Sequence, residues 1–434
     1  MNVYFYTLGC KVNQYETQAM MRLAEEHDYT ALEFTLGQAD VGDGVIVINS
    51  CTVTGESDRK LRQLLRRCRR EHPHAVLVLC GCMPQAFPET AAAFEDVDIV
   101  LGNASRKALM AHLHRFLTTR ARIVDIAPHD NTFEPLQICE FQGRTRAFVK
   151  IEDGCNRFCT YCIIPYARGR VRSRPLDDLR EEVCALAQNG YTEVVLVGIN
   201  LTAYGQDIGL DIGDAVACAC GVEGIRRVRL GSLEPDHMTP ELIGRLAKHK
   251  KLCPQFHLAL QSGCDATLKR MNRHYDTAHY RAVCDELRKA FPDCALTTDV
   301  MVGFPDETEE EFEQSLAFVE SIGFSRLHCF AYSRREGTIA ARAKGQIPNA
   351  EKARRNRRMI KAGEESCRRF ADALVGKTVT VLFETTEEDG CIGYTDTYVP
   401  VVAENAASGQ LSSVRIERSD NGICYGKIKS DTVG

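Results

Sequence analysis

The stretch RAFVKIEDGCNRFCTYCIIPYARGRVRSR, residues 146–174, joins an apolar strand pattern to a loop with three cysteines. AFVKI predicts a buried strand, and Cys155, Cys159 and Cys162 follow it with three and then two residues between them. A closed zinc site or a ferredoxin loop would need a fourth ligand, and the next dozen residues contain no Cys or His. The spacing therefore favours an iron–sulfur cluster with one iron left open for a cofactor or substrate. Packed cysteines are the alternative.

Apolar strands alternate with helical segments on both sides of this loop. Residues 1–135 have the pattern of a parallel α/β sheet. From Arg146 onward, six further strand candidates alternate with helices, which is more than most open sheets need and fewer than the eight of a closed barrel. We therefore expect an α/β protein with a central partial (β/α)6 barrel and an active site at the C-terminal ends of its strands.

The last part of the chain has a different character. TVTVLFETTEEDGCIGYTDTYVPVV (378–402) and SSVRIER (412–418) predict short strands joined by Gly, Asp and Asn turns. They indicate a small antiparallel β-barrel. We expect three domains, at residues 1–138, 139–370 and 371–434.

Composition limits the class of protein. The 434 residues are too many for one ordinary core, and 44% apolar with 26% charged residues is typical of a globular protein. The longest apolar runs are far too short to span a membrane, and the N-terminus does not resemble a signal peptide. We expect a cytoplasmic protein with no membrane partner, where reducing conditions argue against disulfides among the 20 cysteines.

A second set of three cysteines follows three strands of the N-terminal sheet. Cys10, Cys51 and Cys82 each come at or just past the C-terminal end of a predicted strand. Parallel strands bring these ends to one edge of the sheet, so the thiols should converge there. Buried strand-end thiols are the alternative. Cys80 competes for the third place, but it lies within its strand, whereas Gly81-Cys82 repeats the pattern of Gly9-Cys10.

Basic residues are concentrated in three runs, although the net charge is −5. The runs cover residues 59–70, 144–174 and 352–369. Solvated helix faces explain many such runs, yet three of them in a mildly acidic chain favour a nucleic-acid partner.

These motifs together resemble a known family over essentially the whole chain. The loop cysteines match the signature of radical S-adenosylmethionine (SAM) enzymes. The following segments are similar to the methylthiotransferases: TLGCKVNQYET (7–17), NSCTVT (49–54), GCMPQ (81–85), LQSGCDATLKRMNRHY (260–275), DVMVGFPDETEEEF (299–312), and GYTDTYVPV (393–401), which looks like their TRAM domain. GCKVNQYET most resembles the branch that modifies N6-threonylcarbamoyladenosine at position 37 of tRNA. Branches acting on isopentenyladenosine or on a ribosomal protein carry other residues after the first Gly-Cys.

The resemblance implies two 4Fe–4S clusters and SAM as cofactors. Cys155, Cys159 and Cys162 would hold the cluster that chelates SAM and cleaves it to a radical, which abstracts hydrogen from carbon 2 of the adenine. The set Cys10, Cys51 and Cys82 would hold an auxiliary cluster carrying the sulfur that is transferred as a methylthio group. The implied partners are the anticodon stem-loop of tRNA and a reducing electron donor.

Polar and glycine residues at the ends of the predicted barrel strands are candidates for holding SAM. Glycine permits close backbone approach, and amide, hydroxyl and carboxylate groups can fix ribose and adenine. The alternative is that such loops are polar in any case. The candidates are Gly198, Asn200, Ser232, Gln261 and Asp299, with Gly231, Ser262 and Gly303 beside them.

Two further groups of residues are candidates for RNA contact. Arg168, Arg170 and Arg172 alternate in sequence, as does Arg174, so one face of an extended segment would be basic and meet tRNA phosphate or the SAM carboxylate. Tyr394 and Tyr398 could stack unpaired bases, with core packing as the alternative.

Net charge argues against phosphate contact by the C-terminal barrel. Residues 371–434 hold ten acidic and five basic side chains. We therefore expect the helix at 352–369 to make more of the phosphate contacts than the barrel does.

Rival interpretations remain at this point. The same chemistry on isopentenyladenosine, or on an aspartate of a ribosomal protein, is the nearest one. A non-catalytic iron–sulfur protein that binds RNA is the rival from a different class.

Overall fold

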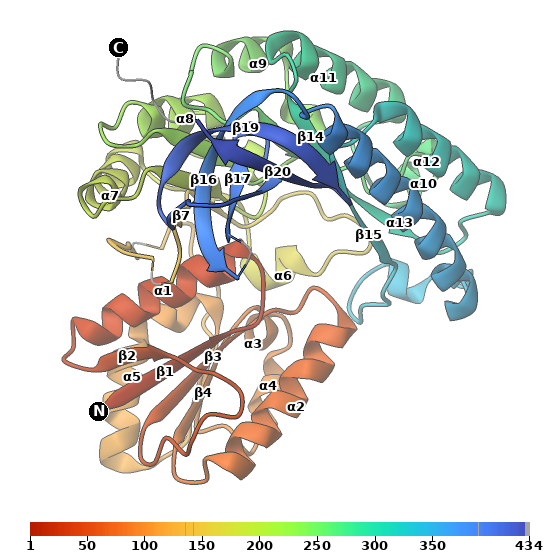
Figure 1. Ribbon diagram of the computed structural model, residues 1–434. Helices are drawn as coiled ribbons and strands as arrows, with labels where there is room; N and C mark the ends of the chain where they lie inside the picture. The colour runs from red at the N-terminus through yellow and green to blue at the C-terminus, as the bar shows by residue number, and fades with distance from the viewer. Residues whose placement is uncertain (135, 142, 389, 430–434) are drawn as a thin grey trace.

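The computed structural model describes residues 1–134, 136–141, 143–388 and 390–429. Its N-terminal part is a six-stranded parallel sheet in the order β2-β1-β3-β4-β5-β6, at the bottom of Figure 1. The strands are β1 (Asn2–Thr7), β2 (Thr30–Glu33), β3 (Val45–Ser50), β4 (Val76–Gly81), β5 (Ile99–Leu101) and β6 (Ile123–Asp125). The central strands β3 and β4 are buried along their whole length, which explains their continuous apolar sequences.

Helices cover both faces of this sheet. On one face, α1 (Lys11–Glu25) and α5 (Leu109–Thr119) contribute to the core; on the other, α2 (Gly55–Glu71), α3 (Cys82–Ala86) and α4 (Pro88–Ala92) do so. A 3-10 helix, η1 (Asn103–Ala108), precedes α5. The helix α1 begins at Lys11, because the Asn13 side chain accepts a hydrogen bond from the Cys10 backbone N–H at 3.2 Å and caps the helix there.

The central part is an incomplete barrel of parallel strands, as the sequence predicts. One ladder has the order β11-β10-β7 and the other β12-β13-β14-β15, and only Gly231 separates β11 from β12. The strands are β7 (Arg146–Lys150), β10 (Glu193–Val197), β11 (Arg227–Leu230), β12 (Ser232–Leu233), β13 (Gln255–Leu258), β14 (Ala295–Val302) and β15 (Arg326–Ala331). The two ladders are therefore consecutive parts of one curved parallel sheet, which forms the incomplete barrel.

Helices cover the outer side of this wall. They are α7 (Leu176–Gln188), α8 (Ile212–Cys220), α9 (Pro240–Leu246), α10 (Asp265–Arg270), α11 (Thr277–Ala290) and α12 (Glu309–Ile322), with the 3-10 turns η2 (Leu201–Ala203), η3 (Pro235–His237) and η4 (Ala340–Arg342) between elements. After β7, a short antiparallel pair, β8 (Glu152–Asp153) with β9 (Arg172–Ser173), brackets the cysteine loop and the short helix α6 (Ile164–Arg168).

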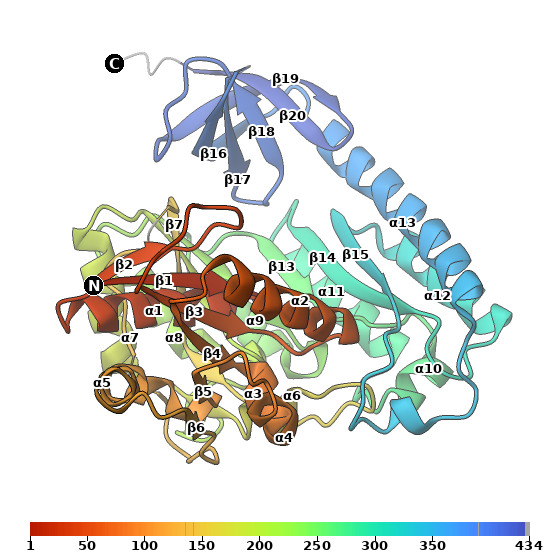
Figure 2. The ribbon, with the colours of Figure 1, turned by 90° about the horizontal axis from the view of Figure 1, so that it is seen from below.

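A long helix, α13 (Asn349–Asp372), leads from the central barrel to a closed five-stranded barrel of order β16-β17-β18-β20-β19 (Figure 2). Its strands are β16 (Thr378–Glu387), β17 (Gly390–Thr395), β18 (Pro400–Ala403), β19 (Leu411–Asp420) and β20 (Ile423–Ile428). All ladders are antiparallel except β18 with β20. One parallel pair is unavoidable here, because an odd number of alternating strands cannot close without it.

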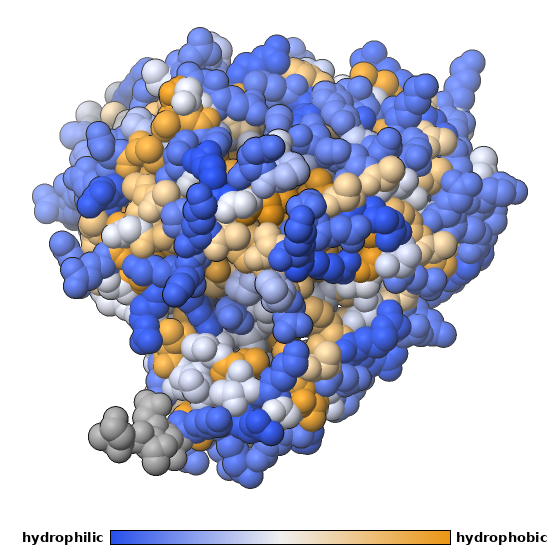
Figure 3. All heavy atoms as spheres, turned by 90° about the horizontal axis from the view of Figure 1, so that it is seen from above, coloured by the Kyte–Doolittle hydropathy of each residue, from blue (hydrophilic) through white to orange (hydrophobic). Residues whose placement is uncertain are grey.

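The surface shows no membrane-spanning element. Among the described residues, no helix is long and apolar enough to cross a bilayer. In Figure 3, hydrophilic residues cover most of the face that is shown, with apolar residues visible between them.

Candidate active site

The loop cysteines (Cys155, Cys159 and Cys162) lie just past β8. Gly154 enters the loop with φ +88°, and a Cβ on it would lie 1.9 Å from the Arg170 carbonyl oxygen, so only glycine fits. The Cys155 N–H then donates to the Gly169 carbonyl at 3.0 Å. The two ends of the loop are therefore held together, and the thiols project from a closed turn.

A second segment, residues 270–273, supports this loop. The Thr160 N–H donates to the Met271 carbonyl at 3.1 Å, and its hydroxyl donates to the Arg270 carbonyl at 2.9 Å. Arg273, which is almost fully buried, places Nη1 3.3 Å from the Cys159 sulfur and also pairs with Glu234. The sequence predictions did not include Arg273.

The chemistry of the loop thiols fits a cluster. Burial and the neighbouring Cys159 raise the pKa of Cys155 and of Cys162 to about 12, so both are protonated thiols in the protein alone. Iron ions supply the positive charge that lets three thiolates stand side by side. The donor set therefore fits a three-cysteine iron–sulfur cluster.

The strand-end cysteines (Cys10, Cys51 and Cys82) are brought together by the N-terminal sheet. They follow β1, β3 and β4, which are adjacent in the order β1-β3-β4. Gly81, at φ +102°, allows the ends of β3 and β4 to approach, since a Cβ there would lie 2.4 Å from the Ser50 carbonyl oxygen. The thiols influence one another: burial, and then Cys82, raise the pKa of Cys51 to about 12.

Cys80 lies on the other side of β4. It is fully buried in the core between the sheet and α1, and its sulfur is 3.9 Å from that of Met20. The structure thus groups Cys82 with Cys10 and Cys51, and assigns Cys80 to packing.

Neither set has the geometry of a single-ion site. Within the described part of the chain, no group of three or more His, Cys, Asp or Glu side chains could hold one metal ion. In a 4Fe–4S cluster each cysteine binds a different iron, so the three sulfurs need not meet at one point. Wider spacing of the thiols is compatible with a cluster.

A buried ion network connects the two sets of cysteines. Arg168 donates from Nε to the Cys82 sulfur at 3.2 Å, and its Nη atoms bind Glu16 on α1 and Asp153, two residues before Cys155. Lys150 binds the same two carboxylates at 2.9 and 2.7 Å. Burial alone would raise the pKa of Glu16, but surrounding cations, Arg168 and Lys150 among them, outweigh it and lower that pKa.

This network corrects the expectation of a basic face along residues 168–174. Arg168 is fully buried, and Arg172 is also buried, donating to the carbonyls of Arg168 and Arg170 at 2.9 Å. Arg174 is buried against Glu182. The extended segment turns these side chains inward toward carboxylates, so they are not available to RNA phosphate. Arg170 alone of the four is exposed, with its guanidinium 4.9 Å from the Phe158 ring centre.

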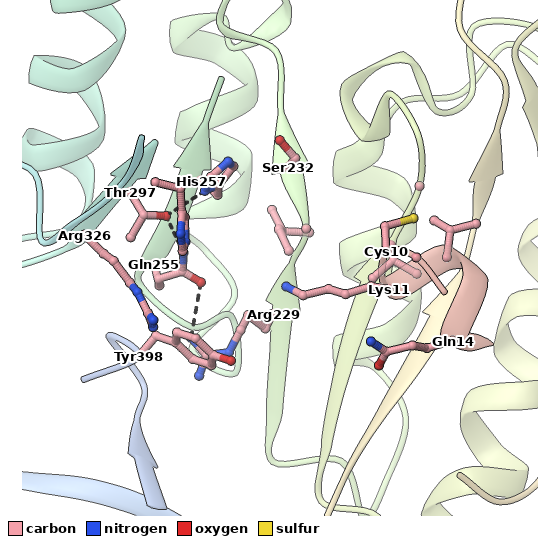
Figure 4. A pocket seen from close by; sticks show the side chains of 17 residues that line it. Cys10, Lys11, Gln14, Arg229, Ser232, Gln255, His257, Thr297, Arg326 and Tyr398 are labelled. Carbon is pink, nitrogen blue, oxygen red and sulfur yellow. Dashed lines mark hydrogen bonds between the residues drawn. The ribbon is translucent and has the colours of Figure 1, made fainter. Parts of the chain in front are cut away.

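A cavity of about 770 Å³ lies between the N-terminal sheet, the central barrel and the C-terminal barrel (Figure 4). Its lining includes Gly9, Cys10, Lys11, Gln14, Gly198, Arg229, Gly231, Ser232, Gln255, His257, Thr297, Arg326, His328 and Tyr398. Polar and basic strand residues, among them Arg229, Gln255 and His257, line the cavity beside the apolar Val197 and Leu230. Such a volume is in the range of sites for small molecules or single nucleotides.

The predicted SAM residues divide between the cavity and the loop cysteines. Gly198 and Ser232 line the cavity. Asn200 is buried, with Nδ2 3.9 Å from the Cys155 sulfur. Gln261 has φ +65°, and its Oε1 is buried without a hydrogen-bond partner in the described structure. Asp299 lies within β14 and not at its end, which corrects the expectation for this residue, and its carboxylate is 3.4 Å from His257 Nε2.

The two tyrosines lie in the contact between the C-terminal and central barrels. Their rings stack 4.8 Å apart, and the Arg146 guanidinium is 5.2 and 5.0 Å from the ring centres of Tyr394 and Tyr398. Arg229 donates to the carbonyl of Asp396 at 2.9 Å and secures the turn between them. The expectation of two free stacking platforms is therefore corrected: the rings form an interface, and Tyr398 lines the cavity.

The basic helix α13 is largely neutralised by its neighbours. Lys352 and Arg355 are buried, and Arg354, Arg355 and Arg358 pair with glutamates of α13, α12 and the loop before α12. The expectation that this helix makes more of the phosphate contacts than the C-terminal barrel therefore rests on the exposed cations that form no ion pair in the described structure, Arg357, Arg368 and Arg369.

Comparison with known proteins identifies the family. The model of the Radical SAM superfamily matches residues 149–319, and that of "Uncharacterized protein family UPF0004" matches residues 2–102. The threonylcarbamoyladenosine tRNA methylthiotransferase MtaB of Bacillus subtilis is 38% identical over 95% of this chain and 93% of its own. The chain belongs to the radical SAM tRNA methylthiotransferases. This confirms the family indicated by the cysteine motifs.

Other relatives of this methylthiotransferase carry two different names. MtaB of Thermotoga maritima is 36% identical, covering 96% of this chain and 95% of its own. The tRNA-2-methylthio-N(6)-dimethylallyladenosine synthase of Caldicellulosiruptor saccharolyticus is 34% identical, covering 87% and 81%. The family uses SAM and two 4Fe–4S clusters, and its substrate is tRNA.

Solved structures share the fold. The radical SAM methyltransferase TsrM of Kitasatospora setae matches with a TM-score of 0.59 and 12% identity, over 78% of this chain and 77% of that one. The cobalamin-dependent enzyme OxsB matches with a TM-score of 0.53 and 11% identity, over 83% and 56%. At such low identity, these likenesses concern the fold alone.

Proposed function

We propose that this methylthiotransferase modifies carbon 2 of N6-threonylcarbamoyladenosine at position 37 of tRNA. The observation that carries the proposal is the cavity beside Cys10, whose lining is cationic and contains no acidic residue among those described. It suits a nucleoside with an anionic substituent better than one with an apolar isopentenyl group. Three relatives with MtaB names, at 38, 36 and 35% identity, also support this substrate.

In this proposal, each set of three cysteines would hold one 4Fe–4S cluster. The loop cysteines would hold the cluster that gives an electron to SAM, and the strand-end cysteines the cluster that carries the sulfur, which a second SAM would methylate. Asn200, Gly198 and Ser232 contact SAM, together with Gln261, shortly past the end of β13, and Asp299 within β14. Gln261 is well suited, because its buried Oε1 has no protein partner in the described structure.

The chain's own residues position these groups. Arg273 and Arg168 donate to the sulfurs of Cys159 and Cys82, which fixes one ligand of each set. Hydrogen bonds donated to the sulfur of a ligand orient that ligand and tune the metal centre. Because Arg168 also binds Glu16 and Asp153, it ties α1 to the cysteine loop and holds the two sets at a fixed separation.

We further propose that the anticodon stem-loop of tRNA is the part of the substrate that is bound. Exposed cations are suited to its phosphates, among them Arg170 near the loop cysteines and Arg62 and Arg66 on α2. The reaction also requires an electron from a reducing donor.

Nucleoside mass spectrometry of tRNA from a strain lacking this gene tests the substrate. We expect 2-methylthio-N6-threonylcarbamoyladenosine to disappear, its unmethylthiolated precursor to accumulate, and the plasmid-borne gene to restore the product. Persistence of the product, with no second enzyme to account for it, contradicts the proposal.

Isopentenyladenosine is the second candidate, favoured by the relatives named dimethylallyladenosine synthases at 34 to 32% identity. A competition assay decides between the two substrates. Reconstituted enzyme receives equal amounts of stem-loops with threonylcarbamoyladenosine and with isopentenyladenosine, and the amount of each methylthio product is measured. A protein aspartate as substrate would leave both RNAs unchanged. Failure to form 5′-deoxyadenosine from SAM and reductant would instead indicate a non-catalytic RNA-binding protein.

A further inference from the structure

Two cations in the cavity have no anionic partner. Lys11 reaches into it from the start of α1 and Arg326 from the start of β15, on opposite sides of the space in Figure 4. Neither side chain makes an ion pair or hydrogen bond that the described structure records. Arg229, the third cation of the lining, is committed to Glu193, Gln255 and the turn at Asp396.

The position of Lys11 is unfavourable for folding. It occupies the first turn of α1, where the helix dipole disfavours a positive charge and where no acidic residue compensates it. Its nearest recorded contact is the Phe148 ring, with Nζ 5.9 Å from the ring centre. A lysine placed against the dipole, beside other cations and without a carboxylate, is better explained by an anionic ligand than by stability.

The cavity also fixes where that anion must lie. Lys11 directly follows Cys10, the proposed cluster ligand, so its amine extends from the place where the reacting adenine has to be held. The neutral groups around it, Ser232, Gln255 and Tyr398, supply hydrogen bonds but no charge of opposite sign. An anion attached to the adenine itself meets these requirements.

We infer that Lys11 and Arg326 bind the carboxylate of the threonylcarbamoyl group and thereby select this modified adenine over adenines with uncharged substituents. This inference rests on the proposed function. Both residues act in substrate specificity, with no part in the cleavage of SAM. Charge-assisted hydrogen bonds to a carboxylate provide strong discrimination, because a neutral analogue leaves the cations unpaired.

Three stem-loops test the inference with reconstituted holoenzyme: one carries threonylcarbamoyladenosine, one its carboxamide, and one unmodified adenosine. The dissociation constant is measured by fluorescence anisotropy, and kcat/KM by formation of the methylthio nucleoside. We expect the wild type to prefer carboxylate over carboxamide by roughly 10- to 100-fold. Lys11→Gln or Arg326→Gln should move this ratio toward one, and Lys11→Arg should keep most of it.

Lys289→Gln, on the exposed surface of α11, is the matched control. It removes one charge outside the cavity and should leave the ratio unchanged. Equal losses on all three RNAs with Lys11→Gln and Arg326→Gln would mean that the cations bind phosphate, and wild-type dissociation constants and kcat/KM on all three would mean that they bind neither; both results overturn the inference while the proposed function stands. If the wild type does not modify the threonylcarbamoyl stem-loop at all, the proposed function fails, and the inference with it.

Discussion

The two sets of cysteines have the same number of thiols but are built differently. The loop cysteines lie within eight consecutive residues, and Gly154 and residues 270–273 hold their loop closed. The strand-end cysteines are separated by dozens of residues and meet because β1, β3 and β4 are neighbours in a parallel sheet. The spacing of cysteines in one loop is thus visible directly in the sequence. The meeting of three cysteines at strand ends depends on the strand order of the whole N-terminal sheet.

The supports of the two sets also differ. Arg273 contacts Cys159 from within the same barrel, while Arg168 comes from the central barrel and contacts Cys82 of the N-terminal sheet. The second set is therefore completed by a neighbouring domain. The comparison predicts that changes in the loop set abolish all chemistry, and that changes in the strand-end set affect a later part of it.

The largest effect is expected from replacing Cys155, Cys159 and Cys162 together by alanine. Without the cluster that binds SAM, anaerobically reconstituted protein should form no detectable 5′-deoxyadenosine, and its iron content should fall by about half. Chromatography of the reaction products and iron analysis measure this. Retained 5′-deoxyadenosine formation would show that these cysteines are not the ligands.

The corresponding change in Cys10, Cys51 and Cys82 should separate the two reactions. Iron should again fall by about half, and methylthiolation of tRNA should be lost, while reductive cleavage of SAM continues. Assays of both products on one sample test this. Loss of both activities together, in protein that keeps half of its iron, would contradict the division of labour between the two sets.

Arg168→Met should have a smaller effect, in which stability and redox properties change together. Removing the guanidinium leaves Glu16 and Asp153 with less compensation, and breaking a buried ion pair typically costs about 3–5 kcal/mol of the free energy of unfolding. Losing a hydrogen bond to a ligand sulfur should also lower the reduction potential of the strand-end cluster.

Urea unfolding and potentiometric titration followed by electron paramagnetic resonance measure these two effects. Arg170→Met, at the exposed arginine two residues away, is the control and should change the free energy of unfolding by less than about 0.5 kcal/mol. A potential that is the same in both variants would limit Arg168 to a structural role.

Cys80→Ala should have the smallest effect. Its sulfur packs in the core against Met20, so we expect a loss of about 1–2 kcal/mol in stability and no loss of iron. Iron analysis next to Cys82→Ala provides the comparison. A drop in iron for Cys80→Ala equal to that for Cys82→Ala would place Cys80 among the ligands.

Much of the fold follows from local patterns in the sequence. The apolar strands at AFVKI and EVVLVG and the helical segments between them predict the barrel, because strand and helix periodicities are local properties. The short strands β2 and β6 are not predicted, since TALE and IVD carry too little apolar sequence. The cavity-lining Arg229 and His257 could have been recognised as polar residues alternating with apolar ones within strands.

Other site residues could not be predicted, because their roles depend on distant partners. Arg168 and Arg172 read as an exposed basic segment, yet they are buried, since Glu16 and Asp153 lie opposite them in the folded chain. The alternating arginines in the sequence do not indicate that Glu16 and Asp153 will be their partners.

The loop cysteines, the alternation of strands and helices, and the family followed from the sequence alone, because each depends on neighbouring residues or on short motifs. The burial of Arg168, Arg172 and Arg174, and the set of cations that face a common cavity, emerged only from the folded chain. These depend on strand order and on contacts between domains, where residues more than a hundred positions apart meet.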